Sequence, residues 1–291
     1  AVASMERVEL LKLSPQLENV CGLRYLDKID DDSTETMLKL EIDLVLYETM
    51  MGRNTNFRLS DQSSAFNDIN YLVYIKRLFK KGDKLIPQMI KNKKPILHFM
   101  THSMLAFSMP LFNCYKEKLK IIELVRHPKS MLTTQTEYNE SWLTDEGKKR
   151  QFQLFFDFDG EEVPFWAKEW EKLYINSNSV ERTIYELAHH NKLRDTFKEK
   201  NNFIYESQCV SIPFERFVVD PWPYLKKIEI LLDSKTTKKT SAKLGKENIP
   251  RSEIIINNNH IAEHLEEKKA SNESISILEK ISNEYENSTS V

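Results

Sequence analysis

An arginine and a hydroxyl residue are spaced in this sequence as two parts of an anion site would be. Arg126 follows the apolar run 121–125, and Thr134 lies eight residues later, on a helix that Pro128 is expected to begin. A guanidinium donates two hydrogen bonds to a phosphate, a helix N-terminus adds positive potential, and a hydroxyl donates a further bond. The spacing predicts a phosphate site at Arg126 and Thr134. The alternative is that Arg126 pairs with a carboxylate while Thr134 faces solvent.

A histidine stands at the end of another apolar run. His102 comes shortly after residues 95–100. An imidazole has an ordinary pKa of ~6.5, so it is largely neutral at pH 7 and can accept a proton. Ligands bind at the carboxyl ends of parallel strands, so we expect His102 and Arg126 on one edge of a sheet. The alternative for His102 is a structural histidine held by hydrogen bonds.

Apolar runs and helical patterns alternate along the chain. Strands are predicted at 95–100, 121–125, 203–205 and 210–214. Helices are predicted at 5–13, 32–51, 71–79 and 85–90, after Asp220-Pro221, and around Ile275, Leu278 and Ile281, with a basic surface loop at 234–251. This alternation favours an α/β fold with a parallel sheet flanked by helices. Because no clear boundary divides the pattern, we expect one domain over 1–291.

Composition excludes several classes of protein. The chain has 291 residues and a formal net charge of −2, which favours neither nucleic acid nor acidic lipid, and no apolar run approaches the ~20 residues of a membrane-spanning helix. Three cysteines are too few for a disulfide framework or a zinc cage. The six glycines are too far apart for a dinucleotide fingerprint or a Walker phosphate loop.

Three other groups of polar residues have plainer interpretations. The acidic run 157–162 is interpreted as a solvated turn rather than a calcium loop. His189-His190, with Glu186 one turn before, is interpreted as a surface pair because adjacent helical side chains point in different directions. The lysines between residues 80 and 94 are most simply solvated, although a polyanionic acceptor could use them. We therefore expect no metal.

The residues around Arg126 resemble the 3′-phosphate motif of sulfotransferases that use 3′-phosphoadenosine 5′-phosphosulfate (PAPS). In that family a strand ends in Arg-x-Pro, and a serine eight residues after the arginine completes the phosphate contact. Here Arg126-His127-Pro128 and Thr134 stand at these positions. The resemblance implies that Arg126 and Thr134 bind PAPS within a P-loop nucleoside triphosphate hydrolase-like sulfotransferase architecture.

Other segments follow in the order that the family has. Met100-Thr101-His102 stands at its Lys-Thr-His strand end, which implies His102 as the general base, although Met100 replaces the lysine. Residues 212–221 are similar to its later strand-to-helix segment, and 235–251 stands where it has a basic closing loop. Its 5′-phosphosulfate loop, which precedes the first helix, has no counterpart here. Since 5–13 is interpreted as that helix, we expect an N-terminally truncated chain that is inactive as given.

The resemblance implies a transferase that moves a sulfuryl group from PAPS, as co-substrate, to a hydroxyl or amine. The acceptor would be a small molecule or a carbohydrate, and neither a metal nor a nucleic-acid partner is implied. Two alternatives stay open: another P-loop-type group transferase, such as a small-molecule kinase, and a non-catalytic binding member of the fold. No motif identifies the acceptor, the oligomeric state or the phosphate contacts of residues 235–251. The compartment also stays open, with the cytoplasm favoured.

Overall fold

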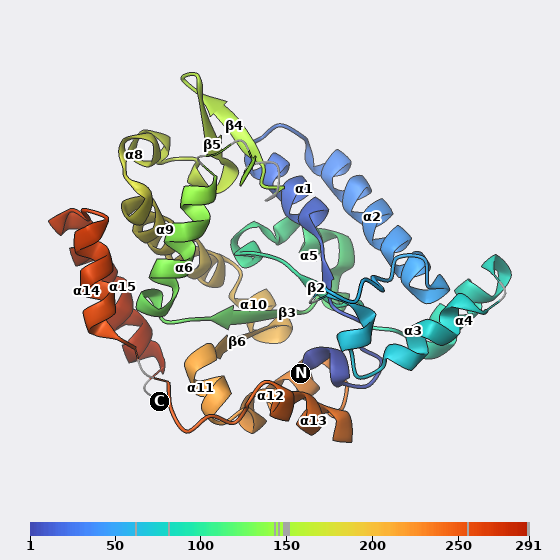
Figure 1. Cartoon of the computed structure of the whole chain (residues 1–291). Coiled ribbons are helices and arrows are strands. Elements are labelled where there is room, and N and C mark those ends of the chain that lie inside the picture. The colour runs from blue at the N-terminus through green and yellow to red at the C-terminus, as the bar shows by residue number, and fades with distance from the viewer. Residues whose placement is uncertain are drawn as a thin grey trace.

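Three short strand pairs lie among many helices in the computed structural model, which describes residues 1–61, 63–80, 82–142, 144, 146–147, 152–254 and 256–289 (Figure 1). Two pairs are parallel and one is a hairpin: β1 (Lys12–Leu13) with β2 (Phe99–Met100), β3 (Ile121–Val125) with β6 (Cys209–Pro213), and β4 (Phe155–Phe158) antiparallel to β5 (Glu161–Pro164). The molecule is therefore mixed α/β and mostly helical. None of the described helices has the length and apolar character needed to cross a membrane.

The α-helices of the described residues come between and after these strands. They are α1 (Pro15–Tyr25), α2 (Asp31–Met51), α3 (Tyr71–Leu78), α4 (Ile86–Lys93), α5 (Met109–Tyr115), α6 (Pro128–Ser141), α8 (Glu171–Asn176), α9 (Ser179–Lys200), α10 (Asn202–Gln208), α11 (Phe214–Val219), α12 (Trp222–Leu232), α13 (Lys238–Lys246), α14 (Asn258–Glu267) and α15 (Asn272–Thr289). Local sequence sets several of their ends. The Asp30 carboxylate caps α2 by accepting from Ser33 N at 2.7 Å, and Gly52 ends α2 with a φ of 86°.

Helices cover both faces of the β3–β6 pair. Alternate strand residues point to opposite faces. On one face, Ile122 and Ile212 belong to an apolar cluster with Leu225 and Ile228 of α12. On the other face, Ile121 and Cys209 belong to a second cluster with Phe112 of α5 and Phe197 of α9. The strands predicted at 121–125 and 210–214 are thus confirmed, and helices cover two faces of this pair. The expectation that His102 and Arg126 share one sheet edge is wrong, because β2 and β3 belong to separate two-stranded sheets.

The helix predicted for residues 5–13 is wrong, because residues 5–7 form a turn and the chain from Val8 to Leu13 runs along residues 96–100. Val8 forms a parallel bridge to Ile96, and Lys12 N donates to His98 O at 2.9 Å. A short apolar run fits helix and strand periods equally well, and here pairing with residues 96–100 decides. The segment interpreted as the first helix is the strand that leads into α1. The reason for expecting another strand before it therefore no longer holds.

Two further predictions of local structure are wrong. Residues 203–205 belong to α10 rather than to a strand, and the expected surface loop 234–251 contains α13. The Thr237 side chain caps α13, and Leu244 is buried at 3% exposure against the N-terminal segment. The sequence of α13 is mostly basic and polar, so it did not predict a helix. The helix packs through Leu244, whose burial depends on the distant N-terminal segment.

Hydrogen bonds join the N-terminal segment to α13 and the turn before it. The Ser4 hydroxyl donates to Thr240 Oγ1 at 2.9 Å, and the Thr237 hydroxyl donates to Ser4 O at 2.9 Å. Glu6 N donates to Lys235 O, also at 2.9 Å. These bonds hold the strand that leads into α1 against a part of the chain more than 220 residues away.

Candidate functional site

Arg126 lies at the carboxyl end of β3, beside the end of the neighbouring strand β6. Its guanidinium stacks on the ring of Phe214, with 4.7 Å between Cζ and the ring centroid. The strand register explains this contact. Val125 and Pro213 are paired at the ends of the two strands, and Arg126 follows the first while Phe214 follows the second. The Arg126 side chain is exposed. Stacking holds the guanidinium plane in place while its N–H groups stay accessible.

The carboxylates around this turn already have other partners. Glu215 accepts from His127 N at 3.1 Å and from the Tyr285 hydroxyl. Glu279 binds Lys129 at 2.8 Å, and Glu286 contacts His127 Nε2 at 3.1 Å. Over the ranges that the structure describes, no carboxylate lies within ion-pair distance of Arg126, and its guanidinium has no hydrogen-bond acceptor. The alternative, that Arg126 pairs with a carboxylate, is therefore not found among the described residues, and the charge stays available to an anion.

The N-terminus of α6 supplies potential but few free donors. Pro128 has no N–H, His127 Nδ1 accepts from Lys129 N at 3.2 Å, and His127 O accepts from Ser130 N at 2.9 Å. His127 is thus the cap of the helix, and with Nδ1 accepting, its Nε2–H donates to Glu286. The free N–H groups that we expected here are already bonded. An anion beside Arg126 would gain from the helix dipole but not from these amides.

Thr134 lies on α6, two turns beyond Arg126, and is exposed. Its hydroxyl forms no hydrogen bond with any residue that the structure describes, and no bond joins it to Arg126. A helix rises 1.5 Å per residue, so Thr134 lies about 9 Å along the axis from Pro128. The structure leaves both predicted phosphate ligands uncovered, each on the element expected for it.

His102 is held by a carboxylate from a different element. It follows β2, and Glu18 in the first turn of α1 accepts from His102 N at 2.8 Å and contacts Nδ1 at 3.1 Å through the same Oε1. The Glu18 side chain is 14% exposed and the His102 side chain 77%. The hydrogen bond to Glu18 raises the pKa of His102, and the charges of Glu18 and Glu186 add to the rise while partial burial opposes it. With Nδ1 bonded to Glu18, Nε2 is the nitrogen left for a proton.

Glu186 of α9 is a second carboxylate near His102. It is 6% exposed, and it accepts from Gln135 Nε2 at 3.2 Å and from Asn139 Nδ2 at 3.1 Å. Burial raises the pKa of Glu186 to about 7, although the two amides and the charge of His102 act in the opposite direction. A carboxyl group with such a pKa can exchange a proton near neutral pH, which is typical of functional sites.

Sequence reasoning missed the roles of Glu18 and Glu186. Residues 5–13, which precede Glu18, were interpreted as a helix. The sequence therefore did not predict that Glu18 follows a strand. Glu186 was weighed only beside His190 as a metal pair. The available signal for Glu186 was its place among apolar helix residues such as Ile184 and Leu187. A glutamate is rarely buried unless it has a partner, so a glutamate on the apolar side of a helix indicates a possible role.

The histidines beside Glu186 are not the surface pair that we expected. The His190 ring lies 5.7 Å from the Trp166 ring, and the His189 ring lies 5.8 Å from the Trp170 ring. Burial lowers the pKa of His190 to about 3, which keeps it neutral. In the ranges described, no group of three or more His, Cys, Asp or Glu side chains could hold a metal ion.

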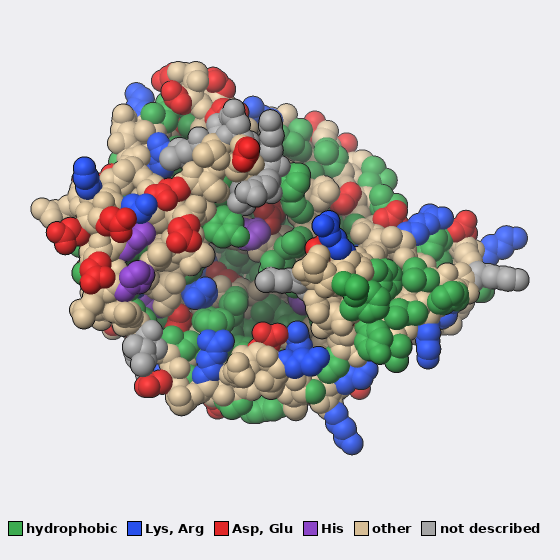
Figure 2. Space-filling model, viewed as in Figure 1, with side chains coloured by type: hydrophobic (Ala, Val, Ile, Leu, Met, Phe, Trp, Pro, Cys, Tyr) green, Lys and Arg blue, Asp and Glu red, His purple; other side chains and the backbone are tan. Residues whose placement is uncertain are grey.

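The carboxyl ends of three strands carry uncovered apolar side chains. Leu13 of β1 is 55% exposed, Met100 of β2 is 42% exposed, and Leu124 of β3 is 55% exposed. Figure 2 shows the molecule hollowed in the middle of one face, with hydrophobic side chains in the hollow. Such surface is typical of a site that receives a ring or an apolar group.

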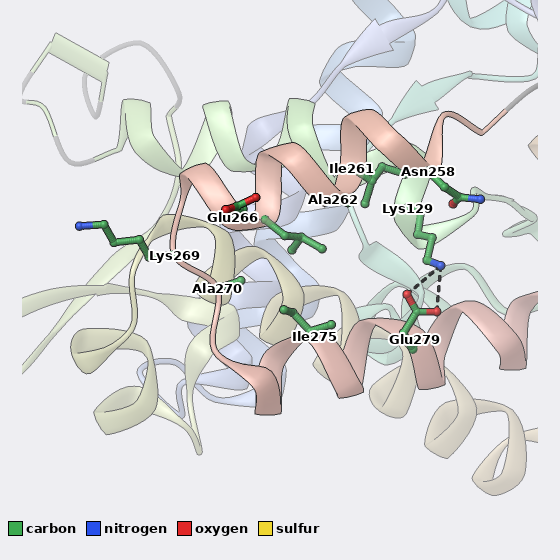
Figure 3. Close-up of a pocket in the computed structure, with 10 residues that line it drawn as sticks. Lys129, Asn258, Ile261, Ala262, Glu266, Lys269, Ala270, Ile275 and Glu279 are labelled. Atoms are coloured by element: carbon green, nitrogen blue, oxygen red, sulfur yellow. Dashed lines mark hydrogen bonds and ion pairs between the residues drawn. The ribbon is translucent and has the colours of Figure 1, made fainter.

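Two grooves flank the start of α6 and α11. One, of about 540 Å³, lies between α14 and α15, where Ile261 and Ile275 line it and the Lys129–Glu279 ion pair lies at one end (Figure 3). The other, of about 480 Å³, is lined by residues that include Glu215 and Tyr224. Neither groove is lined by His102, Arg126 or Thr134. All three residues are exposed, His102 and Arg126 just after strands and Thr134 on α6.

Comparison with known proteins adds no further assignment. No protein-family model matches the chain, and neither a curated protein nor a solved structure matches it.

Proposed function

We propose that the chain is the nucleotide-binding and acceptor-activating part of a PAPS-dependent sulfotransferase. The observation that carries the proposal is the Arg126 guanidinium, exposed at the end of β3, stacked on Phe214 and without a carboxylate partner in the described residues. A positive charge so placed suits the 3′-phosphate of PAPS, to which it would donate two parallel hydrogen bonds. Thr134 would donate the further bond.

The His102–Glu18 pair supports the proton-transfer half of this proposal. In sulfuryl transfer the acceptor oxygen or nitrogen attacks sulfur, and the bond from sulfur to the bridging oxygen of PAPS breaks. The acceptor proton would pass to Nε2 of His102, while Glu18 holds Nδ1 and stabilises the imidazolium that forms. Adenosine 3′,5′-bisphosphate leaves. The remaining stabilisation is electrostatic, as in phosphoryl transfer.

The donor's 5′ side has less support in this chain. Ser14 alone separates β1 from α1, and Pro15 occupies the first helical position, so no loop of backbone N–H groups stands there. A sulfate group needs such donors or a cation. We therefore expect the chain to bind the nucleotide product and not to transfer sulfate by itself. A small-molecule kinase is less favoured, since Arg126 occupies the strand end where a kinase would hold magnesium with a carboxylate.

Calorimetry with adenosine 3′,5′-bisphosphate tests the proposal. Arg126→Ala should weaken binding by about 1.5–3 kcal/mol, since a hydrogen bond to a charged group is lost. Arg216→Ala is the matched control, because Arg216 is also exposed and lies on the adjacent α11. The proposal is rejected if wild type does not bind the nucleotide, or if Arg126→Ala binds it as well as Arg216→Ala does.

A second measurement asks whether this chain performs transfer. Labelled PAPS is incubated with the chain and a mixture of small-molecule and carbohydrate acceptors, and labelled product is counted. We expect nucleotide binding without transfer. Transfer that depends on His102 would support the function and overturn the prediction of inactivity. Hydrolysis of a nucleoside triphosphate instead would favour the kinase alternative.

A further inference from the structure

Helix α3 is amphipathic in the opposite sense to an ordinary surface helix. Tyr74 and Arg77, although each bears a polar group, face inward at 3% and 4% exposure. Leu72, and Phe79 directly after the helix, face outward at 53% and 83% exposure. A helix on the surface of a globular protein normally turns its apolar stripe to the core. This one presents its apolar stripe to the outside.

Buried hydrogen bonds fix this orientation. Arg77 donates to both carboxylate oxygens of Glu9 at 2.8 Å and to Thr49 O at 2.9 Å. The Tyr74 hydroxyl accepts from Leu10 N at 2.6 Å. Turning the outer stripe inward would break all four of these bonds and leave the charges of Arg77 and Glu9 unpaired in the interior, which is costly. The outward stripe is therefore a stable feature of the fold.

The stripe belongs to a wider apolar surface. Residues 59–85 contain eight of the large hydrophobic side chains that are exposed in the described residues: Leu59, Phe66, Tyr71, Leu72, Val73, Leu78, Phe79 and Leu85. Ring contacts join Phe66 to Phe57 at 5.5 Å and to Tyr71 at 6.4 Å. Figure 2 shows hydrophobic side chains gathered over α3 and α4, at the edge of the molecule where Figure 1 places these helices. A patch this large on a protein surface marks an interaction site.

The same part of the chain is rich in basic residues. Residues 71–94, here called the α3–α4 lobe, contain eight basic residues and one acidic residue, in a chain whose formal net charge is −2. Among the residues of the lobe that the structure describes, the exposed lysines are Lys76, Lys80, Lys84, Lys91, Lys93 and Lys94. None of these six forms an ion pair with a carboxylate among the residues that the structure describes. The lobe thus combines exposed apolar groups with unneutralised positive charge.

We propose that the α3–α4 lobe docks on an anionic lipid surface. Lysines at the margin of such a patch attract acidic headgroups, and the outward Leu72 and Phe79 would enter the boundary between headgroups and acyl chains. A soluble polyanion would use the lysines but would leave the apolar stripe in water. A second copy of the chain would cover the stripe but would bring the lysines of two lobes together. The lipid surface uses both features.

Vesicle sedimentation of the full 291-residue chain tests the proposal. The chain should sediment with vesicles of phosphatidylcholine and phosphatidylserine and not with vesicles of phosphatidylcholine alone, and added salt should weaken the binding. The double variant Lys76→Glu, Lys80→Glu should lose about fivefold or more in affinity for each lysine replaced. The double variant Leu72→Ser, Phe79→Ser should also lose affinity, because its apolar insertion is removed.

The matched control is the double variant Leu40→Ser, Leu44→Ser on α2. Leu40 and Leu44 are 67% and 52% exposed, but they lie outside the lobe, so binding should stay at the wild-type level. Thermal melts of all variants confirm that they fold. Equal binding to both kinds of vesicle overturns the proposal. So does vesicle binding that the Leu72, Phe79 variant leaves unchanged, which would favour a soluble polyanion as the partner, or a dimer in sedimentation velocity that this variant dissociates.

Discussion

Glu18 and His102 are joined through one carboxylate oxygen, which receives both the backbone N–H and the Nδ1 side of the same histidine. Glu18 lies on α1, which follows β1, and His102 follows β2. The strands β1 and β2 pair in parallel. The contact therefore depends on strand pairing as well as on the two side chains. It fixes the ring so that Nε2 faces away from Glu18.

Glu18→Gln should lower the pKa of His102. The amide oxygen keeps an acceptor for Nδ1–H, but the negative charge that favours the imidazolium is gone, so the pKa should move back toward its ordinary value. In wild type, protonated His102 stabilises the fold below its unfolded pKa of ~6.5, and this contribution is lost as pH rises through the raised value. NMR titration of His102 measures the change. Glu206→Gln, at an exposed position, is the control, and equal His102 pKa values in the two variants would contradict the assignment.

Glu186→Gln should remove part of the pH dependence of stability. Because burial raises the pKa of Glu186 from 4.5 to about 7, unfolding releases its proton in this window and stability falls as pH rises through it. The wild-type loss is on the order of 3 kcal/mol, since one pKa unit is about 1.4 kcal/mol. Denaturant unfolding at pH 5 and pH 8 should show a smaller difference for Glu186→Gln. The exposed Glu263→Gln should behave as wild type; a Glu186→Gln chain that also keeps the full pH difference would refute the prediction.

Arg77→Met should destabilise the fold by about 3–5 kcal/mol, because it leaves the buried Glu9 carboxylate without its partner. The double variant Glu9→Leu, Arg77→Met should recover part of this loss, since neither charge then remains in the interior. Equilibrium urea unfolding measures both. Arg58→Met removes an exposed ion pair with Asp61 and should cost less than about 1 kcal/mol. Equal costs for Arg77→Met and Arg58→Met would show that the buried pair has no special weight.

Thr134→Ala should weaken binding of adenosine 3′,5′-bisphosphate, and Thr134→Ser should not. Only the hydroxyl is proposed to donate to the phosphate, so its loss should cost about 0.5–1.5 kcal/mol while the methyl group is dispensable. Calorimetry of both variants, with Thr133→Ala as a neighbouring control, checks this. If the alanine and serine variants bind alike, Thr134 has no part in the site.

Longer patterns in the sequence predicted the helices well but not always their buried side. The apolar stripe that includes Met37, Leu40 and Leu44 predicts α2, and Gly52 ends this helix as expected. These three side chains are nonetheless exposed, whereas Leu38 and Val45 are buried. The helix carries apolar residues on more than one side, so periodicity alone does not select the side that packs.

The candidate site was predictable only where one strand end carried its own signal. Arg126 and Thr134 follow a strand that the sequence placed correctly, so their position on β3 and α6 could be predicted. Glu18 of α1 contacts His102, and the charge of Glu186 of α9 acts on its pKa, yet each lies 84 residues from His102 in the chain, a separation that no local pattern reports. The parallel pairing of β1 with β2 was hidden because residues 5–13 fit a helix equally well.

The hydrogen bond between Ser4 and Thr240 has a consequence for how the protein is made. During synthesis Ser4 leaves the ribosome 236 residues before its partner Thr240 in α13. Contacts so distant in sequence form late, because a long loop must close before they contribute. The strand that leads into α1 must therefore wait for α13, and a stalled or shortened chain would leave its apolar side chains without cover.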